Sequence, residues 1–431
     1  MPGKTTRSSN LELLRILCML LIIGDHLTGQ SGIADYTTLP SSFAFCLIGC
    51  GSRIACSVFV LIGGWFLCEQ PYKTRRPLSL WLSLWLYTVP VTLLCKLAGL
   101  DVSWGALRWA AFPASTRQLW FISDYLLLLL CVPLLNRLLR GLSRPAHRGL
   151  LAVLAVPLIV YPTLFGENGA VSDTTWMFLY EYLLIAYLRR WPDNRLAHLL
   201  QHRAAALGLG LGLPLLNTIL RAVLETRGLT DGKAFQYMAY YRTALGALPN
   251  LLAALALFYL FKELDLGCVR WVNALAGTTL GVYILHQVPA FRGFLWNGLL
   301  QTEAHHGSVG YTLLAILAVF LGCAAVDALR TALVMRPLEK KRVFKGGGEK
   351  GDEIAAKSKA DDEKEGGGGR NTAKSTGERK KKGRKGEGRK TKQKQKREKG
   401  KTKERDEGSR GKEKKRERKK KRKRGKKKST S

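Results

Sequence analysis

The end of the sequence contains almost none of the residues that form a protein core. From residue 345 to residue 431 there is no leucine, valine, methionine, cysteine or aromatic residue, and Lys, Gly, Glu and Arg predominate. Such a segment buries too little apolar surface to offset the entropy lost on ordering its chain. This composition excludes a folded domain after residue 344 and predicts a disordered tail.

The absence of aromatic residues from the tail also bears on its partners. The tail holds 38 of the 68 Lys and Arg residues and 15 of the 32 Asp and Glu residues, so it carries +23 of the formal net charge of +36. Basic chains attract phosphate backbones, but binding of single strands also relies on aromatic side chains that stack on bases. Anionic lipid headgroups, or plain solvation, are favoured over nucleic acid. Because the change after Phe344 is abrupt, a frameshifted end is a further interpretation.

The cysteines lack the spacing of a disulfide framework. All nine lie in the apolar part of the chain, mostly within long apolar runs. Cys46 and Cys50 are four residues apart on one helical face, but no histidine or acidic residue lies near them in sequence. We therefore interpret the cysteines as packing residues and expect no metal site.

A cleavable signal peptide also lacks support. Lys4 and Arg7 precede an apolar run, yet Glu12 and Arg15 interrupt it and no small-residue cleavage site follows. Ser9 and Glu12 have the spacing of a capping box, which predicts a helix that begins after Ser9.

Ten apolar runs before residue 345 have the length of membrane-spanning helices. A helix needs about 20 apolar residues to cross a hydrocarbon core of ~30 Å. The chain is therefore predicted to be an all-α polytopic membrane protein, with a membrane domain over residues 1–344 and a disordered basic tail over 345–431. The predicted spans are 10–28, 43–67, 78–99, 118–138, 148–165, 174–190, 203–221, 244–262, 271–290 and 311–334.

Lys and Arg concentrate in alternate loops between these spans, as they do in the cytoplasmic loops of membrane proteins. The loops at 29–42 and 166–173 contain neither. With an even number of spans, this asymmetry predicts a protein of the cell membrane whose N- and C-termini are both cytoplasmic. The basic loops contain Lys73, Arg75, Arg76, Arg137, Arg140, Arg144, Arg148, Arg189, Arg190, Arg195, Arg203, Lys262 and Arg270.

Charged side chains inside the predicted spans are the first candidates for function, because a charge at the bilayer centre costs at least ~2.5 kcal/mol. Arg15 and His26 are eleven residues apart, which leaves them within about 20° of each other on one helix face. Their separation along the axis is about 16 Å, with Arg15 at the cytoplasmic end. Asp25 points about 100° away from His26 and is not expected to orient its ring.

Other polar residues are expected at the depth of His26. The ninth span carries a histidine, and three further spans carry an arginine or a carboxylate at a comparable level. Together these side chains are predicted to line one polar cavity with His26. They are His286, Arg53, Asp124 and Glu181.

Such a cavity suits two kinds of function. A neutral imidazole can act as a general base that takes a proton from a hydroxyl nucleophile near neutral pH. Buried histidines and carboxylates also form proton relays in transporters. The residues by themselves leave both interpretations open.

The order of three sequence motifs resembles acyltransferase family 3. The first is Asn10-Leu-Glu-Leu-Leu-Arg15-Ile, with His26 following Arg15 after ten intervening residues. The second, Trp120-Phe-Ile-Ser-Asp-Tyr125 through Pro133-Leu-Leu-Asn136, is similar to the family's fourth span. The third, Gly281-Val-Tyr-Ile-Leu-His286, is similar to its late Tyr-Leu-Ile-His segment. The similarity runs from about residue 9 to residue 340 and leaves out the tail.

The resemblance implies an O-acyltransferase that takes an acyl group, commonly acetyl, from cytoplasmic acyl-coenzyme A and delivers it to a hydroxyl of a cell-surface or exported glycan. It implies that His26 is catalytic and that Arg15 helps to bind the donor, for which a guanidinium suits the coenzyme A phosphates. A snorkelling anchor is the alternative role of Arg15. A transporter of a glycan or lipid-linked intermediate is the alternative function. No bound cofactor is expected.

The chain departs from the family pattern at one position. The family's second span often reads Phe-x-x-x-Ser-Gly followed by Tyr or Phe, whereas this chain has Phe59-Val-Leu-Ile-Gly63-Gly64-Trp65. Any role of that serine hydroxyl is absent here, although the two glycines still allow helices to approach closely.

Overall fold

The computed structural model of the chain describes residues 9–167 and 174–335. Within these residues the protein consists of α-helices with short 3-10 and π-helical turns, and no strand occurs there. The predicted all-α fold is thereby confirmed for this part of the chain. The predicted boundary after residue 344 and the basic tail over 345–431 lie outside the described residues.

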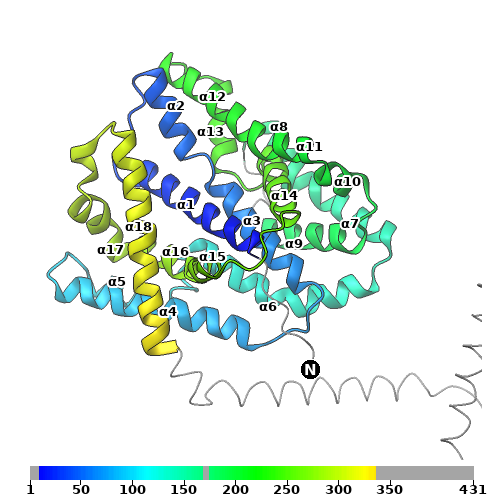
Figure 1. The fold of residues 1–431 in the computed structure, drawn as a ribbon, viewed down its shortest axis with the longest axis horizontal. Helices are drawn as coiled ribbons and strands as arrows, with labels where there is room; N and C mark the ends of the chain where they lie inside the picture. The colour runs from blue at the N-terminus through cyan, green and yellow to red at the C-terminus, as the bar shows by residue number, and fades with distance from the viewer. Residues whose placement is uncertain (1–8, 168–173, 336–431) are drawn as a thin grey trace, which may run out of the picture. The chain divides into compact units, whose positions relative to one another are not determined.

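Two helices form the centre of the membrane domain. The helix α1 (Asn10–Gln30) packs against α3 (Ser52–Leu67), and α3 also packs against α9 (Thr174–Arg190) and α14 (Leu248–Lys262). Figure 1 shows α1 and α3 enclosed by the later helices. On its other side α1 contacts α15 (Arg270–Ala276), α16 (Thr279–Gln287) and α18 (Val309–Arg330).

The remaining helices surround this centre. On one side α4 packs against α5, α6 and α17, and on another α12 packs against α2 and α13. The π-helical turns η1, η2 and η5 each continue an α-helix rather than end it. These elements are α2 (Leu39–Ile48), α4 (Arg75–Leu97), α5 (Trp104–Ala111), α6 (Trp120–Gly141), α7 (Arg144–Ala155), η1 (Val156–Val160), α8 (Tyr161–Phe165), α10 (Arg195–Gln201), α11 (Arg203–Leu207), η2 (Gly208–Gly212), α12 (Leu213–Thr226), α13 (Lys233–Thr243), α17 (Pro289–Gly293), η3 (Phe294–Leu299), η4 (Thr302–His305) and η5 (Thr331–Met335).

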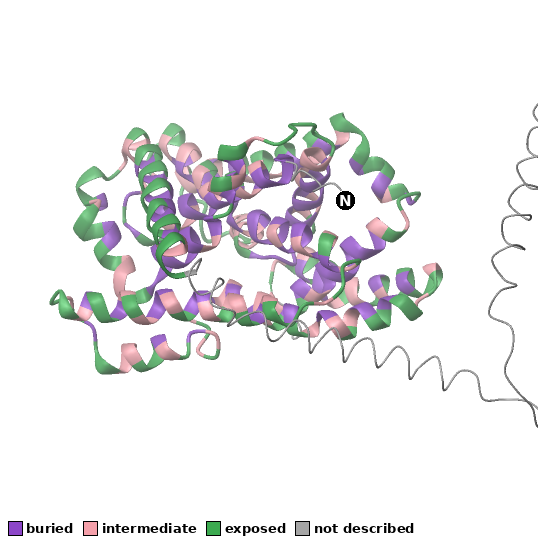
Figure 2. Cartoon of the chain, turned by 60° about the horizontal axis from the view of Figure 1, so that its bottom comes forward, coloured by how far each residue is buried: buried purple, intermediate pink, exposed green. Residues whose placement is uncertain are grey.

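The peripheral helices carry large apolar side chains on their outward faces. Leu97 is 75% exposed, Leu134 is 72% exposed and Leu314 is 67% exposed. Figure 2 shows buried residues gathered on the central helices and exposed residues on the outer ones. Leucines exposed in this way are compatible with contact to hydrocarbon, because lipid tails are as apolar as leucine.

Seven helices in the described residues have the length and composition of membrane spans. They are Leu39–Leu67, Arg75–Leu97, Trp120–Gly141, Arg144–Phe165, Arg203–Thr226, Lys233–Lys262 and Val309–Val334. The chain is therefore a multi-pass membrane protein. The other three predicted spans correspond to α1, which carries three charged residues, to α9, which has 17 residues, and to α15 and α16, which are separated by a break. The count of ten spans stays a prediction.

The start of α1 differs from the prediction in one respect. The helix begins at Asn10 as expected, but the Ser9 side chain makes no capping hydrogen bond to it. The Ser9 hydroxyl instead donates to Asn273 Oδ1 at 2.9 Å and accepts from the Val269 N–H at 2.7 Å. The predicted capping box is therefore wrong, because a tertiary contact with the start of α15 uses the same hydroxyl.

The break between α13 and α14 lies directly against η1. A Cβ atom at Gly246 would lie 2.4 Å from the carbonyl oxygen of Leu158. Because a backbone oxygen cannot rotate away as a flexible side chain does, only glycine fits here without displacing η1.

Replacing Gly246 with Ala should therefore destabilise the protein by about 1–3 kcal/mol through overpacking. The measurement is thermal unfolding of the purified protein in detergent. Gly212→Ala is the matched control, because an added Cβ at Gly212 meets nothing within 4 Å. Equal melting temperatures of the two variants would contradict the predicted clash.

Candidate active site

Two histidines from opposite ends of the chain meet inside the bundle. His26 Nδ1 on α1 lies 2.9 Å from His286 Nε2 on α16. His286 is fully buried, and its Nδ1 lies 2.6 Å from the carbonyl oxygen of Val282, one turn earlier in α16. His26 is partly exposed. The two predicted histidines are thus neighbours, with His286 behind His26.

The Val282 carbonyl determines which nitrogens of a neutral pair carry protons. A carbonyl oxygen only accepts hydrogen bonds, so His286 Nδ1 must be its donor. A neutral His286 then has a lone pair on Nε2, which accepts the N–H of His26 Nδ1. This order leaves the lone pair of His26 on Nε2, away from His286. The pair therefore presents an unprotonated nitrogen, as a general base requires.

An aromatic wall holds the two imidazole rings. The ring centroid of Tyr283 lies 6.4 Å from that of His26 and 6.1 Å from that of His286. Behind them Trp296 packs edge-on against His286, and Phe121 packs edge-on against Tyr283. These rings cover His286 and exclude water from it, which strengthens the hydrogen bonds of the histidine pair.

Aromatic rings connect Arg53 with the histidines. Its guanidinium lies 4.7 Å from the ring centroid of Trp120, which packs against Phe121, and Phe121 packs against Tyr283 beside His26. Arg53 also lines a cavity of about 200 Å³ that reaches the break between α13 and α14. The lining residues are Arg53, Thr174, Met177, Tyr240, Thr243, Ala244, Leu245 and Gly246.

Asp25, the neighbour of His26 in sequence, binds an arginine rather than the histidine. Arg242 on α13 donates from one guanidinium nitrogen to Asp25 Oδ1 at 2.7 Å and from Nε to the carbonyl oxygen of Gly49 at 3.1 Å. Gly49 is the C-cap residue of α2. Arg242 therefore links α1 and α13 to the short connection between α2 and α3, just before Arg53.

Arg15 lies on α1, about 16 Å along the axis from His26. Its side chain is 27% exposed and pairs with Glu12 at 3.4 Å, a long contact for an ion pair. The Nε atom of Arg15 is buried and has no hydrogen-bond partner within the described part of the chain. The guanidinium is thus only weakly engaged.

Asp124 and Glu181 lie apart from the histidine pair, each in its own polar contacts. Asp124 accepts from Arg117 at 2.9 Å and from the hydroxyls of Thr174 and Thr175. Glu181 is fully buried on α9 and accepts from the Ser57 hydroxyl at 2.5 Å. The second oxygen of Glu181 has no hydrogen-bond partner in the residues that the structure describes.

Sequence reasoning missed a buried cluster where α4, α16 and α18 meet. The Tyr87 hydroxyl donates to Asp327, and Arg330 donates to both residues. An added Cβ at Gly281 would lie 2.4 Å from Asp327 Oδ1, so the cluster is packed directly against the helix that carries His286. Charged residues within the last span were the available signal.

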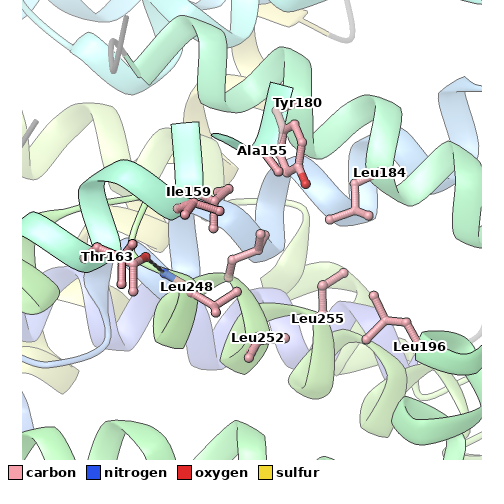
Figure 3. Close-up of a pocket in the computed structure, with 12 residues that line it drawn as sticks. Ala155, Ile159, Thr163, Tyr180, Leu184, Leu196, Leu248, Leu252 and Leu255 are labelled. Atoms are coloured by element: carbon pink, nitrogen blue, oxygen red, sulfur yellow. Dashed lines mark hydrogen bonds between the residues drawn. The ribbon is translucent and has the colours of Figure 1, made fainter. Parts of the chain in front are cut away.

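A second cavity in the described residues, larger than the one beside Arg53, contains none of the predicted catalytic groups. It measures about 300 Å³ and lies between η1, α9 and α14, with leucines along its walls (Figure 3). Its main polar feature is the hydrogen bond from the Leu248 N–H to the Thr163 hydroxyl at 2.8 Å, which satisfies the first turn of α14. None of the predicted site residues lines this cavity.

The fold and the paired histidines define a helical membrane protein with a partly buried imidazole pair. Residues 8–328 match the family model described as an acyltransferase domain. This match covers most of the chain, and the protein therefore belongs to acyltransferase family 3, as the three motifs predicted. No significant match to curated proteins or to solved structures is found.

The ion pair of Asp25 and Arg242 should contribute measurably to stability. Arg242→Met removes the partner of a mostly buried carboxylate and two donors, which should cost about 1–3 kcal/mol. The double variant with Asp25→Asn should lose less stability than the two single variants lose together, because the second change no longer breaks the ion pair. Thermal unfolding in detergent measures all three variants.

Exposed Arg148, replaced with Met, is the control and should leave the melting temperature unchanged. Additive losses from Asp25→Asn and Arg242→Met would show that the two residues act independently.

Proposed function

We propose that this membrane acyltransferase transfers an acyl group, acetyl in the simplest case, from cytoplasmic acyl-coenzyme A to a hydroxyl of a cell-surface or exported glycan. The observation that carries the proposal is the chain of contacts from the Val282 carbonyl through His286 to His26. It leaves His26 Nε2 as a base at the partly exposed end of the pair.

In the proposed reaction His26 Nε2 accepts the proton of the acceptor hydroxyl while the hydroxyl oxygen attacks the acyl carbonyl carbon. The bond between that carbon and the sulfur of coenzyme A breaks, and the sulfur leaves with the proton that His26 returns. The products are an ester and free coenzyme A, so His26 ends in its starting state. His286 stabilises the imidazolium by accepting from His26 Nδ1, as the third residue of a catalytic triad does.

Arg15 is proposed to bind the phosphates of the donor. Its long contact with Glu12 and its unpartnered Nε leave donors for a phosphate group. Because Arg15 lies about 16 Å from His26, phosphates at Arg15 would leave the thioester end of the donor to reach the histidine.

A transporter that uses the same polar groups is the competing function. The directions of the hydrogen bonds in the histidine pair favour the enzyme. The chain of donors ends at the buried carbonyl of Val282, which cannot pass a proton onward as a transporter relay would need. A transporter would not require release of coenzyme A, so the enzyme assay separates the two functions.

His26→Ala should lower acetyl transfer and coenzyme A release by about 10²–10⁴-fold, because the general base is lost. The measurement uses radiolabelled acetyl-coenzyme A and membranes that contain matched amounts of the two proteins. His198→Ala, at an exposed position on α10, is the control and should retain full activity. Activity of the His26 variant equal to that of the parent chain would refute the assignment.

His286→Ala should lower the turnover number about 10²-fold, because His26 loses the acceptor that orients it. His286→Gln should retain more activity, since the amide oxygen can accept from His26 Nδ1. The Michaelis constant for acetyl-coenzyme A should change little in either variant. Steady-state kinetics test this, and a glutamine variant no better than the alanine variant would remove His286 from the proposed role.

A further inference from the structure

The side chain of Arg53 has no anionic partner among the described residues. Its guanidinium contacts the face of Trp120, and it forms no side-chain hydrogen bond or ion pair within the described part of the chain. The carboxylates of Asp25 and Asp124 are occupied by Arg242 and Arg117, respectively.

Arg53 is half-buried, and its side-chain nitrogens have no acceptor within the described residues. A guanidinium stays charged in proteins, so an anion that accepts two of its N–H groups is a matching ligand. Carboxylates and phosphates fit this fork. Trp120 orients the plane of Arg53 by cation–π contact but offers no hydrogen-bond acceptor oxygen.

The cavity beside Arg53 has the size and lining for part of a polar molecule. Its volume is about 200 Å³. The cavity is bounded by the guanidinium, by the hydroxyl-bearing residues Thr174, Tyr240 and Thr243, and by the segment 244–246 that connects α13 and α14. The hydroxyls of Thr174 and Thr243 donate to Asp124 and to carbonyls of α13, and a hydroxyl that donates can still accept a hydrogen bond from a bound molecule. The aromatic rings of Trp120, Phe121 and Tyr283 contact one another in turn and lead from Arg53, at the cavity wall, to His26.

We infer that the acyl acceptor is acidic, and that Arg53 binds its carboxylate or phosphate in this cavity while a hydroxyl of the same molecule reaches His26. This inference rests on the proposed function and adds to it the chemical class of the acceptor. The bonds made and broken are those of acyl transfer. The anionic group is unchanged by the reaction and serves only to bind and orient the acceptor.

The donor is the less suitable source of the anion. In acyl-coenzyme A the phosphates lie at the far end of the pantetheine arm from the thioester. When the thioester carbon is at His26, the phosphates are therefore remote from it, in the direction of Arg15. An anion held by Arg53, on the aromatic side of His26, then belongs to the acceptor.

Binding tests the inference without acyl transfer. The full chain with His26→Ala, reconstituted in lipid nanodiscs, is titrated with methyl glucuronoside, glucose 6-phosphate and uncharged methyl glucoside. We expect the better of the two charged probes to bind about 10- to 100-fold more tightly than the uncharged one, as expected for a charge-assisted hydrogen-bonded pair. Adding Arg53→Gln should abolish this difference and leave binding of methyl glucoside unchanged.

Two further variants serve as controls for this titration. Arg53→Lys retains the charge but not the fork and should keep part of the preference. Exposed Arg148→Gln should keep all of it. Equal affinity for the three probes, or a preference that survives Arg53→Gln, would overturn the inference.

Kinetics on the chain with intact His26 separate the two sources of the anion. If the acceptor supplies it, Arg53→Gln leaves the Michaelis constant for acetyl-coenzyme A unchanged and raises that for the acidic acceptor. A rise confined to acetyl-coenzyme A would assign the anion to the donor and overturn the inference. If no His26-dependent transfer occurs and the charged probe still binds through Arg53, the proposed enzyme fails while the anion site stands.

Discussion

Each polar side chain inside this bundle has to find a partner within the protein, because the surrounding hydrocarbon offers none. This constraint explains why the described polar residues occur in groups rather than singly. Asp25 lies with Arg242, Asp124 with Arg117, and Asp327 with Tyr87 and Arg330. The contacts of Asp25 with Arg242, of Asp327 with Tyr87 and of Asp124 with Thr174 join helices that are distant in sequence. These groups therefore help to fix which helices are neighbours.

Against this background the histidine pair and Arg53 differ from the other polar groups. In the neutral pair His286 has both ring nitrogens engaged, while His26 keeps one nitrogen for an external proton. Arg53 has an aromatic face for its charge but no carboxylate in the described residues. A substrate with a hydroxyl and an anionic group would supply the partners that these two side chains lack, which is why the proposed site is here rather than in the leucine-lined cavity.

Much of this arrangement could be predicted from the sequence. The helical fold follows from long apolar runs, and the helical period placed Arg15 and His26 on one face of α1. The depth of His286 in its span predicted its position beside His26, and the family followed from the order of the three motifs.

Other features depend on tertiary contacts that no local pattern contains. The Ser9 hydroxyl has the spacing for a helix cap but bonds instead to the start of α15. Arg242 lies on α13, which falls outside every predicted span, so its pairing with Asp25 was not foreseeable. The contacts of Asp124 and Glu181 depend on how their helices are rotated about their own axes, which the composition of the sequence does not specify.

The contact of His26 with His286 joins residues that are 260 positions apart. During synthesis the first of these helices leaves the ribosome long before its partner exists. A nascent chain that has inserted only its early helices therefore contains an imidazole without its orienting neighbour and without the aromatic wall from α16. If the pair is catalytic as proposed, activity requires synthesis at least through α16, and shorter products of translation would occupy the membrane as inactive chains.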